Sequence, residues 1–317
     1  MKKRIIAVAM ACAFMFSAIG CSKSGSQTEN SQNQNSEIRV VTDANGEVTI
    51  PANPERIVDL SGCSDTLALL GYNVVGTCNS SGYDYTKIVS YLEDTLQNAQ
   101  VLGYSMSETV DIESVIALNP DLIVISKTQQ KSYDQLSEIA PTVMVDVEQT
   151  DMKADMMKIA AVMGKEDDLN KWIADYEAEA KALGDEIKAR NGEDATYLSF
   201  LASQNSIFIY DIAGLGNFLY HDLGLKRPEN LPEQEDVSLP VVTLEGLAEI
   251  NGDYFVATAT DEDLALLNSS SIWKSMDTVK NGNYITLPAD PYFNQGYSPV
   301  GRQKLLEEIR TFLDENK

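Results

Sequence analysis

The sequence predicts an α/β protein in which two lobes with central parallel sheets are joined by one long α-helix. Two observations lead to this fold class. First, apolar residues recur at every third or fourth position across residues 165–191, which is the period of a helix with one buried face. Second, the segments before and after this helix repeat one another. The apolar stripe consists of Leu169, Trp172, Ile173, Tyr176, Ala180, Leu183 and Ile187.

The repeat aligns residues 110–124 with residues 242–256 without gaps, at a constant offset of 132 residues (242 − 110). Each copy is typical of a short helix with a Glu in its first turn, an Asn-x-Asp turn and an apolar strand. This order is typical of parallel sheets. We therefore predict an N-terminal lobe over residues 38–164, a bridging helix over 165–191 and a C-terminal lobe over 192–317.

Residues 1–20 have the pattern of a signal peptide, with three basic residues followed by an apolar run over residues 5–16. That run is too short to span a bilayer permanently. The segment Ala18-Ile19-Gly20-Cys21 resembles a bacterial lipobox, so we expect Cys21 to carry a lipid anchor. A plain secretory signal is the alternative. The polar residues 21–37 predict a flexible tether, and the body is then held at the outer face of the cell membrane, or on the periplasmic side in a Gram-negative cell.

The elements of the N-terminal lobe follow in order. Asn45-Gly46, between two β-branched runs, predicts a hairpin. Strands are predicted at residues 56–60, 74–77 and 143–147, in addition to the strand of the repeat. Helices are predicted at residues 64–70 and 152–163, each followed by a Gly.

In the C-terminal lobe, a strand is predicted at residues 195–201, followed by a hairpin-like strand at residues 206–210 and a helix at residues 215–223. Residues 231–239 are an extended polar loop, and a final helix is predicted at residues 299–313.

Five segments in this order resemble ABC-transporter solute-binding proteins of the iron-siderophore, haem and cobalamin class. They are TDANGEVTIPANPERIV, DIESVIALNPDLIVIS, YDQLSEIAPTV, the long central helix and WKSMDTVKNGNYITL. The resemblance covers the chain from about Ile38 onward. It implies the class III periplasmic-binding-protein fold, a monomer that binds its ligand in a shallow cleft between the lobes, and only a small closure of that cleft.

The resemblance also implies that Glu113 and Glu245, one in each lobe, pair with arginines of an ABC permease. The alternative is that each is merely an acidic residue favoured by the positive end of its helix. Two glutamates at symmetric positions favour docking.

Aromatic and hydroxyl side chains follow the predicted strands, where open parallel sheets bind ligands. Rings with a few polar groups suit a bulky, partly apolar chelate. For any one of them, packing in the core or on the surface is an equal alternative. The candidates are Ser61, Cys63, Tyr83, Tyr85, Tyr104, Met106, Lys127, Lys131, Tyr210, Thr258, Tyr292, Phe293 and Tyr297.

The cations of the predicted cleft bear on the ligand. Binders of anionic siderophores in the class carry several Arg or Lys there, whereas Lys127 and Lys131 are the main candidates in this chain. This favours a ferric hydroxamate of low charge, with no cofactor and no metal bound directly by the protein. Haem is the alternative, because Gly103 and Met106 match half of the motif that haem binders of the class use. The matching C-terminal region, residues 255–261, has no His. His221 lies inside a predicted helix, and cobalamin ranks behind haem.

Cys63 and Cys78 come just after strands that are predicted to be neighbours in a parallel sheet. Neighbouring strands lie roughly 4.8 Å apart, which is near the range of a disulfide. We therefore predict a Cys63–Cys78 bond, with two free buried thiols as the alternative.

The chain has a formal net charge of −24, which argues against a nucleic-acid partner. It lacks a Gly-x-Ser-x-Gly, a His-Glu-x-x-His and a Gly-rich phosphate loop. We therefore expect a binding protein and not an enzyme. An extracellular sensor or adhesin on the same fold would differ from it in its partner.

Overall fold

The computed structural model describes residues 37–315, without the side chain of Glu315. The predicted signal peptide, the predicted anchor Cys21 and the predicted tether up to residue 36 therefore lie outside the described residues. The described residues belong to one compact unit. Among them, no helix is long and apolar enough to cross a membrane.

The N-terminal lobe is built on a five-stranded sheet in the order β7-β4-β3-β8-β9. Every neighbouring pair is parallel, as predicted. All residues of β3, β4, β8 and β9 are buried, which is typical of a parallel sheet covered on both faces. The strands are β3 (Ile57–Asp59), β4 (Val74–Thr77), β7 (Gln100–Val101), β8 (Leu122–Ser126) and β9 (Thr142–Val145).

The two faces of this sheet are covered by different helices. Ile57 and Leu122 pack with α4 (Met152–Met163) on one face, together with Leu67 of α1 (Ser64–Leu69). Val58 and Ile123 point to the opposite face, because side chains alternate along a strand. There they pack with α2 (Ile112–Ala117) and α3 (Tyr133–Ser137).

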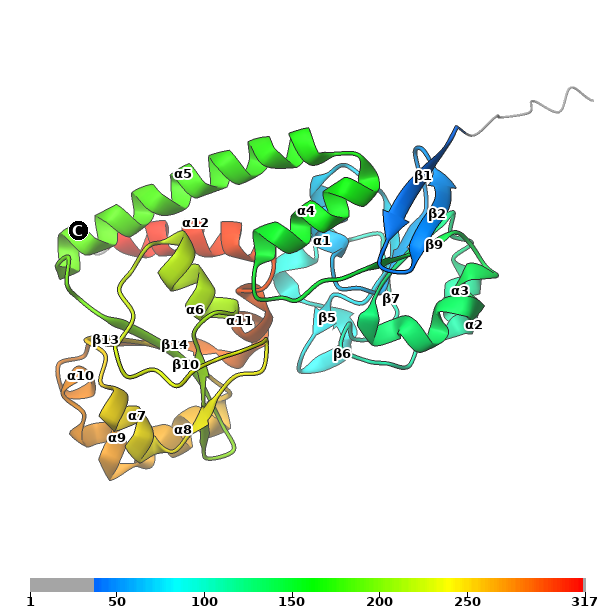
Figure 1. Ribbon diagram of the computed structural model, residues 1–317. Helices are drawn as coiled ribbons and strands as arrows, with labels where there is room; N and C mark the ends of the chain where they lie inside the picture. Colours follow the sequence, from blue (N-terminus) through cyan, green and yellow to red (C-terminus); the bar gives the residue numbers. More distant parts are fainter. Residues whose placement is uncertain (1–36, 316–317) are drawn as a thin grey trace, which may run out of the picture. The chain divides into compact units, whose positions relative to one another are not determined.

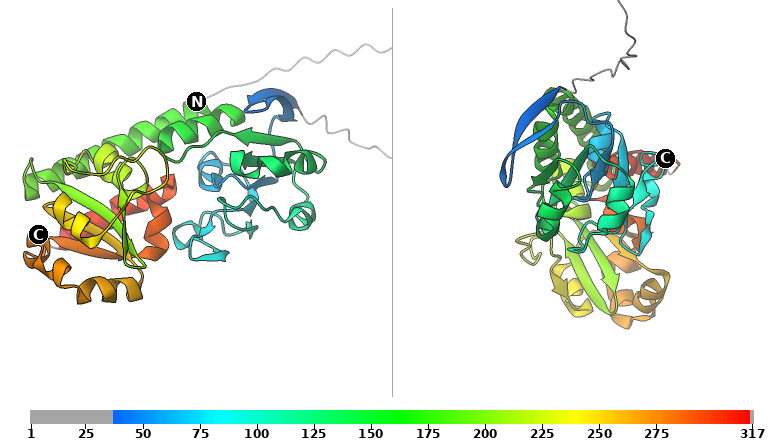
Figure 2. Two further views of the ribbon diagram at one scale, coloured as in Figure 1. Left: turned by 60° about the horizontal axis from the view of Figure 1, so that its bottom comes forward. Right: turned by 90° about the vertical axis from the view of Figure 1, so that its right-hand side faces the viewer.

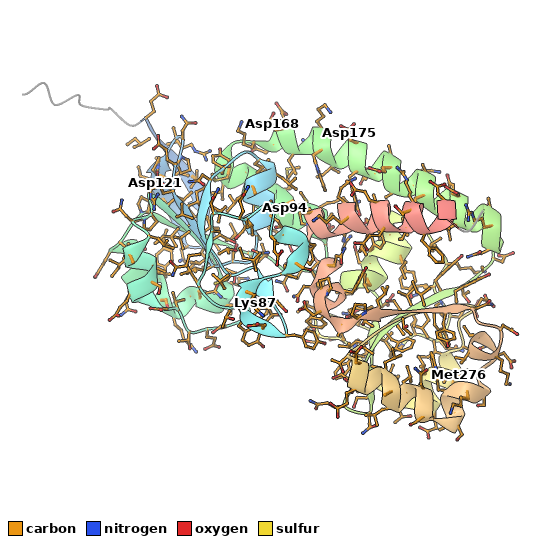
Figure 3. All side chains as sticks on the ribbon, turned by 180° about the vertical axis from the view of Figure 1, so that it is seen from behind. Lys87, Asp94, Asp121, Asp168, Asp175 and Met276 are labelled. Carbon is orange, nitrogen blue, oxygen red and sulfur yellow. The ribbon has the colours of Figure 1, made fainter. Side chains whose placement is uncertain are left out.

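Two hairpins flank this sheet. The first is the predicted one, and it pairs β1 (Ile38–Asp43) with β2 (Gly46–Pro51). Its turn is fixed by Asp43 Oδ1, which accepts from the backbone N–H groups of Asn45 (2.7 Å) and Gly46 (2.9 Å). The second, β5 (Ser80–Ser81) with β6 (Asp84–Ile88), is not predicted from the sequence. Lys87 in Figure 3 marks this second hairpin.

The C-terminal sheet, in the order β12-β11-β10-β13-β14, is mixed rather than wholly parallel. The parallel part consists of β10 (Tyr197–Ser203), β13 (Tyr254–Ala259) and β14 (Tyr284–Pro288). The antiparallel part adds β11 (Ser206–Tyr210) and β12 (Val241–Val242). Gln204 (φ 49°) and Asn205 (φ 62°) make a tight left-handed turn from β10 to β11, so no crossover helix intervenes.

Helices cover both faces of this second sheet as well. Leu198 and Phe200 of β10 pack with α7 (Leu244–Ile250), α8 (Asp261–Ser269) and α9 (Ser271–Ser275). Tyr197 and Leu201 point to the other face, toward the long green helix α5 (Glu166–Asn191). Figure 2 (left) shows the strands between that green helix and the gold and orange helices. The remaining elements are η1 (Ser90–Leu92), η2 (Lys127–Ser132), α6 (Gly214–Asn217), the π-helix η3 (Phe218–Asp222), α10 (Asp277–Lys280) and α11 (Ala289–Gln295).

The repeat has the same structure in both lobes. α2 and β8 form one copy, and α7 and β13 form the other. The repeated Asn ends each helix in a left-handed conformation, with φ 45° at Asn119 and 51° at Asn251. The repeated Asp then ties its strand to the neighbouring one. Asp121 Oδ1 accepts from the Arg56 N–H at 2.9 Å, and Asp253 Oδ2 accepts from the Thr196 N–H at 2.8 Å.

The predicted bridging helix is confirmed as α5, and its apolar stripe is buried or half-buried along its length. Asp168 and Asp175 lie on its exposed side (Figure 3). The last helix, α12 (Pro299–Glu315), lies alongside α5 (Figure 1) and its neighbours include α1 and η1 of the N-terminal lobe. The chain therefore returns to the N-terminal lobe at its end, within the segment predicted to be wholly C-terminal.

Candidate ligand-binding cleft

A cleft with a cavity volume of about 700 Å³ is lined by loops from both lobes. From the N-terminal lobe it takes the segments that follow β3, β4 and β7, which are the carboxyl ends of parallel strands. From the C-terminal lobe it takes the end of β10, part of β11, the polar loop 237–239 and the segment from α11 to the start of α12. The cleft thus lies where ligands bind to open α/β sheets, and its volume suits a small molecule.

A buried carboxylate shapes the first of these loops. Asp59, the last residue of β3, accepts hydrogen bonds from the hydroxyl groups of Ser61 (2.5 Å) and Ser64 (2.6 Å). Burial raises the pKa of Asp59, and these hydrogen bonds oppose that rise. Asn79 completes the network by donating from Nδ2 to the Gly62 carbonyl oxygen at 2.8 Å. The loop that enters α1 is therefore held in one conformation at the edge of the cleft.

Aromatic rings form one wall of the cleft. Tyr85 and Tyr104 stack with their ring centroids 4.8 Å apart. Tyr83, on the β5–β6 hairpin, meets Phe293 of α11 edge to face at 6.2 Å, which joins the two lobes across the cleft. The same junction has a hydrogen bond of 3.0 Å from the Gly82 N–H to Asn294 Oδ1. Tyr83 and Tyr85 remain 46% and 55% exposed, so both rings are available to a ligand.

A second buried carboxylate, Asp65 of α1, lines the cleft and joins the lobes. Ser298 donates from its hydroxyl to Asp65 Oδ2 at 2.5 Å, and it accepts from the Gly301 N–H at 2.9 Å in the first turn of α12. The Thr66 N–H donates to Asp65 Oδ1 at 2.8 Å. Burial raises the pKa of the Asp65 carboxyl to about 6, against the lowering effect of these two hydrogen bonds.

Arg302 is the one cation among the residues that line the cleft, and its charge is already paired. Its Nη1 donates to Asp222 at 2.6 Å and to the Asn217 side chain at 2.8 Å, while its Nε donates to the Gly296 carbonyl oxygen at 2.7 Å. The side chains of Arg302 and Asp222 are only 3% and 1% exposed. Arg302 therefore fixes the start of α12 rather than offering a charge to a ligand.

Seven of the thirteen predicted ligand-binding residues line the cleft. They are Cys63, Tyr83, Tyr85, Tyr104, Met106, Phe293 and Tyr297. Their binding role stays a prediction, but their placement agrees with it. All seven lie in loops or short elements near strand ends, which is the signal that identified them.

The two predicted cations do not line the cleft, and this corrects the expectation that they supply its positive charge. Lys127 and Lys131 belong to η2, which turns away after β8. Lys127 donates to Asp146 at 2.6 Å, and Lys131 is paired with Glu108. Both lysines are exposed, and each is engaged by a surface carboxylate.

Four other candidates also lie outside the cleft lining. The Ser61 hydroxyl donates its hydrogen bond to Asp59, in the network described above. Tyr210 and Thr258 are fully buried in the C-terminal lobe, and Thr258 donates to the Phe200 carbonyl oxygen at 3.2 Å. Tyr292 points to α12, where its hydroxyl donates to Glu308 at 2.9 Å. In each case the side chain is used for packing or for a structural hydrogen bond within the protein.

Sequence reasoning missed several residues of the lining. Asp65, Ser80 and Asn294 carry polar groups, and Met152 and Met156 of α4 add apolar surface. The hydroxyl of Ser80 is buried, and it has no hydrogen-bond partner among the described residues. A signal did exist for Ser80, since it follows β4, as Tyr104 follows β7. No local signal distinguishes Asp65 from an ordinary first-turn acid.

The predicted Cys63–Cys78 disulfide is absent, because both cysteines are free thiols in the structure. The strands are neighbours as expected, but the side chains pack on opposite sides of the sheet. Cys78 belongs to the cluster of Val58, whereas Cys63 packs against the cluster of Ile57. Burial raises the pKa of both thiols, that of Cys78 to about 12.

Glu113 and Glu245 occupy the same position in the two lobes. Each lies in the first turn of its helix, two residues after an N-cap that accepts a backbone N–H, Asp111 in α2 and Thr243 in α7. Both glutamates are exposed, and neither forms an ion pair or a side-chain hydrogen bond with another described residue. The repeated Asn and Asp have a structural task in each lobe, whereas the repeated Glu has none within the described chain.

A protein-family model described as "Periplasmic binding protein" matches residues 62–291 of this chain. The chain belongs to this family. The matched segment begins in the loop after β3, continues through both repeat blocks and the bridging helix, and ends at the start of α11. The match therefore covers the part of the lining up to Leu239, and the lining residues from Phe293 to Arg302 follow its end.

Individual relatives agree with the family. The iron(3+)-hydroxamate-binding protein YxeB of Bacillus subtilis (strain 168) is 29% identical over 335 residues, covering 100% of both chains. The iron(3+)-hydroxamate-binding protein FhuD of the same organism is 30% identical over 276 residues, covering 84% of each chain. The structure of unliganded, reductively methylated FhuD2 from Staphylococcus aureus matches with a TM-score of 0.68 and 27% identity, covering 81% of this chain and 98% of that one.

Proposed function

We propose that this periplasmic binding protein captures a ferric siderophore of the hydroxamate type outside the cytoplasm and delivers it to an ABC permease. One observation carries the ligand class. The cleft of about 700 Å³ is lined by rings and hydroxyl groups, and its single cation, Arg302, is already paired with Asp222. Catecholate and carboxylate chelates of iron carry several negative charges, whereas a tris-hydroxamate chelate of Fe³⁺ is neutral at its metal centre. The names of the relatives support the same class.

Haem is less well supported. The residues lining the cleft include Met106 but no His. His221 is exposed in η3 and does not belong to the lining.

The direct test is quenching of the intrinsic Tyr and Trp fluorescence by ferric hydroxamates. We expect saturable quenching at sub-micromolar concentration, because Tyr83, Tyr85 and Tyr104 line the cleft. The iron-free hydroxamate and the gallium complex serve as controls, and they separate chelate binding from absorption by the ferric centre. Tight binding of haem with no response to any ferric hydroxamate would contradict the proposal.

We further propose that Glu113 and Glu245 are the contacts for the permease and that lipidated Cys21 anchors the protein to the membrane. The support for docking is that the two glutamates are exposed, unpaired among the described residues and equivalent in the repeat. Carboxylates in such positions fit arginine side chains, which bind them with two parallel hydrogen bonds. Cys21 lies outside the described residues, and its support is the lipobox-like segment alone.

A further inference from the structure

We propose that the cleft selects among ferric hydroxamates by their net charge and that Asp65 is the residue that disfavours anionic chelates. This inference rests on the proposed function, because it presupposes that a ferric hydroxamate occupies the cleft. It names a specificity-determining residue that acts through its charge.

The charges of the lining residues differ in how far they are compensated. Three side chains carry a charge: Asp65, Asp155 and Arg302. Arg302 is paired with Asp222, as described above. Asp155 is ion-paired with Lys158 at 3.1 Å, and it also accepts from the Gln149 N–H at 2.7 Å.

Asp65 has no such compensation. Its partners are a hydroxyl group and a backbone N–H, and no Lys, Arg or His among the described residues forms an ion pair with it. The negative charge of the nearby Asp59 raises the pKa of Asp65 further. With a pKa of about 6, Asp65 is mainly ionised at pH 7.5. The lining of the cleft therefore carries a negative charge that no cation pairs with among the described residues.

This charge acts strongly because it is buried. Asp65 is only 2% exposed, so mobile ions do not screen it as they screen surface carboxylates. Interactions between charges are larger in such surroundings than in water. The remaining polar groups of the lining, such as the free hydroxyl of Ser80, suit uncharged oxygens and amides of a chelate.

A matched ligand series isolates charge from shape. The ferric complex of desferrioxamine B has a free terminal amine and is a cation. Acetylating the amine makes it neutral, and succinylating it makes it an anion, while the tris-hydroxamate iron centre is unchanged. We expect the dissociation constant to rise in that order, from cation to neutral chelate to anion. The expected change is about tenfold per step, which corresponds to about 1.4 kcal/mol. Titrations at about 0.3 M salt suppress the contribution of the acidic protein surface.

Asp65→Asn then tests the residue. Asn has nearly the same shape and retains an oxygen that accepts from Ser298. We expect the ratio of anion to cation dissociation constants to fall by about tenfold, and the ratio is the readout because it cancels any change in affinity that is common to all three chelates. Asp134→Asn is the matched control, because Asp134 is exposed, lies in α3 outside the cleft lining and removes the same charge. It should leave the ratio unchanged.

The outcomes separate this inference from the proposed function. Equal binding of the three chelates by the wild type overturns the charge inference and leaves the function standing, and this result does not depend on whether the variant folds. An unchanged ratio in Asp65→Asn overturns the role of Asp65. If none of the three chelates binds, the proposed function fails and the inference fails with it.

Discussion

The backbone carbonyl oxygen of Leu223 lies only 1.8 Å from the position that a Cβ on Gly184 would occupy. Gly184 is buried in the middle of α5, and the missing side chain lets the segment after η3 approach the bridging helix directly. In the sequence Gly184 reads as a single Gly of the kind that a helix interior tolerates. The structure gives it a task, which is close packing of the C-terminal lobe on the bridging helix.

The effect of Gly184→Ala on the free energy of unfolding tests this close packing, because the substitution would stabilise an exposed helix and destabilise a tightly packed one. In an exposed helix position the substitution stabilises by about 1 kcal/mol, because Ala is the better helix former. Here the clash with backbone atoms should instead lower the free energy of unfolding by about 1–3 kcal/mol or more. Urea denaturation measures the difference. Ala182→Gly, on the exposed side of the same helix, is the control and should cost about 1 kcal/mol. A more stable Gly184→Ala variant would show that the contact is not close.

The raised pKa of Asp65 predicts how stability depends on pH. Its value moves from 3.8 to about 6 on folding, so between these values the folded protein keeps a proton that the unfolded chain has released. The contribution of the protonated Asp65 to the free energy of unfolding is fully present below about pH 4 and is lost as the pH rises through about 6. Each pKa unit corresponds to about 1.4 kcal/mol, which gives about 3 kcal/mol in total.

Asp65→Asn removes this titration. Its free energy of unfolding, relative to wild type, should rise by about 3 kcal/mol between pH 4 and pH 7. Asp59, Cys63 and Tyr91 interact electrostatically with Asp65, and Asp155 and Arg302 line the same cleft; all five are present in both proteins. Denaturation curves at several pH values check the prediction. A constant difference across this range would mean that Asp65 titrates normally.

The stacked pair of Tyr85 and Tyr104 predicts a loss of ligand affinity when one ring is removed. Tyr104→Leu abolishes the 4.8 Å stack and takes an aromatic surface from the cleft. The stack with Tyr85 is present with and without ligand, so the expected loss comes from the contact between the Tyr104 ring and the bound chelate. An aromatic contact contributes about 0.5–1.5 kcal/mol, so the dissociation constant for a ferric hydroxamate should rise by about 2- to 10-fold. Isothermal titration calorimetry measures it. Tyr292→Leu, outside the cleft lining, should bind as the wild type does, and equal affinities in all three proteins would remove Tyr104 from the site.

The two equivalent glutamates predict a separation between binding and transport. Glu113→Ala and Glu245→Ala should each impair uptake of radioactive ferric hydroxamate by cells, while the purified variants bind the ligand with wild-type affinity. The reason is that both carboxylates are exposed and lie outside the cleft lining. Glu249→Ala on the outside of α7 is the control and should transport normally. A purified Glu variant that no longer binds ligand would show that its carboxylate belongs to the binding site or supports the fold.

The parts of the fold that follow from local sequence patterns were predictable. The bridging helix, the two repeat blocks and the hairpin at Asn45-Gly46 depend on periodicity, caps and turn residues that lie within a few positions of one another. At the antiparallel edge of the C-terminal sheet, the hairpin-like strand at residues 206–210 was predicted, whereas the short strand β12 that pairs with it was missed. The cleft was predictable to the extent that it uses residues directly after strands, such as Tyr104.

The remainder of the site depends on contacts between distant parts of the chain. Asp65 and Ser298 are 233 positions apart, and Gly82 and Asn294 are 212 positions apart. A single sequence does not reveal such pairs. Lys127 and Lys131 follow a strand like the residues of the cleft, but η2 turns them outward, and its direction is set by the capping box that Ser126 and Gln129 form.

The equivalent hydrogen bonds made by Asp121 and Asp253 have a consequence for how the ligand specificity of such a receptor changes during evolution. They hold each central pair of strands from the amino-terminal end of the sheet, and the cleft is assembled from loops at the opposite end. Substitutions, insertions and deletions in those loops therefore leave the scaffold intact. The loops can therefore acquire a new ligand specificity during evolution while the sheets of the two lobes stay the same.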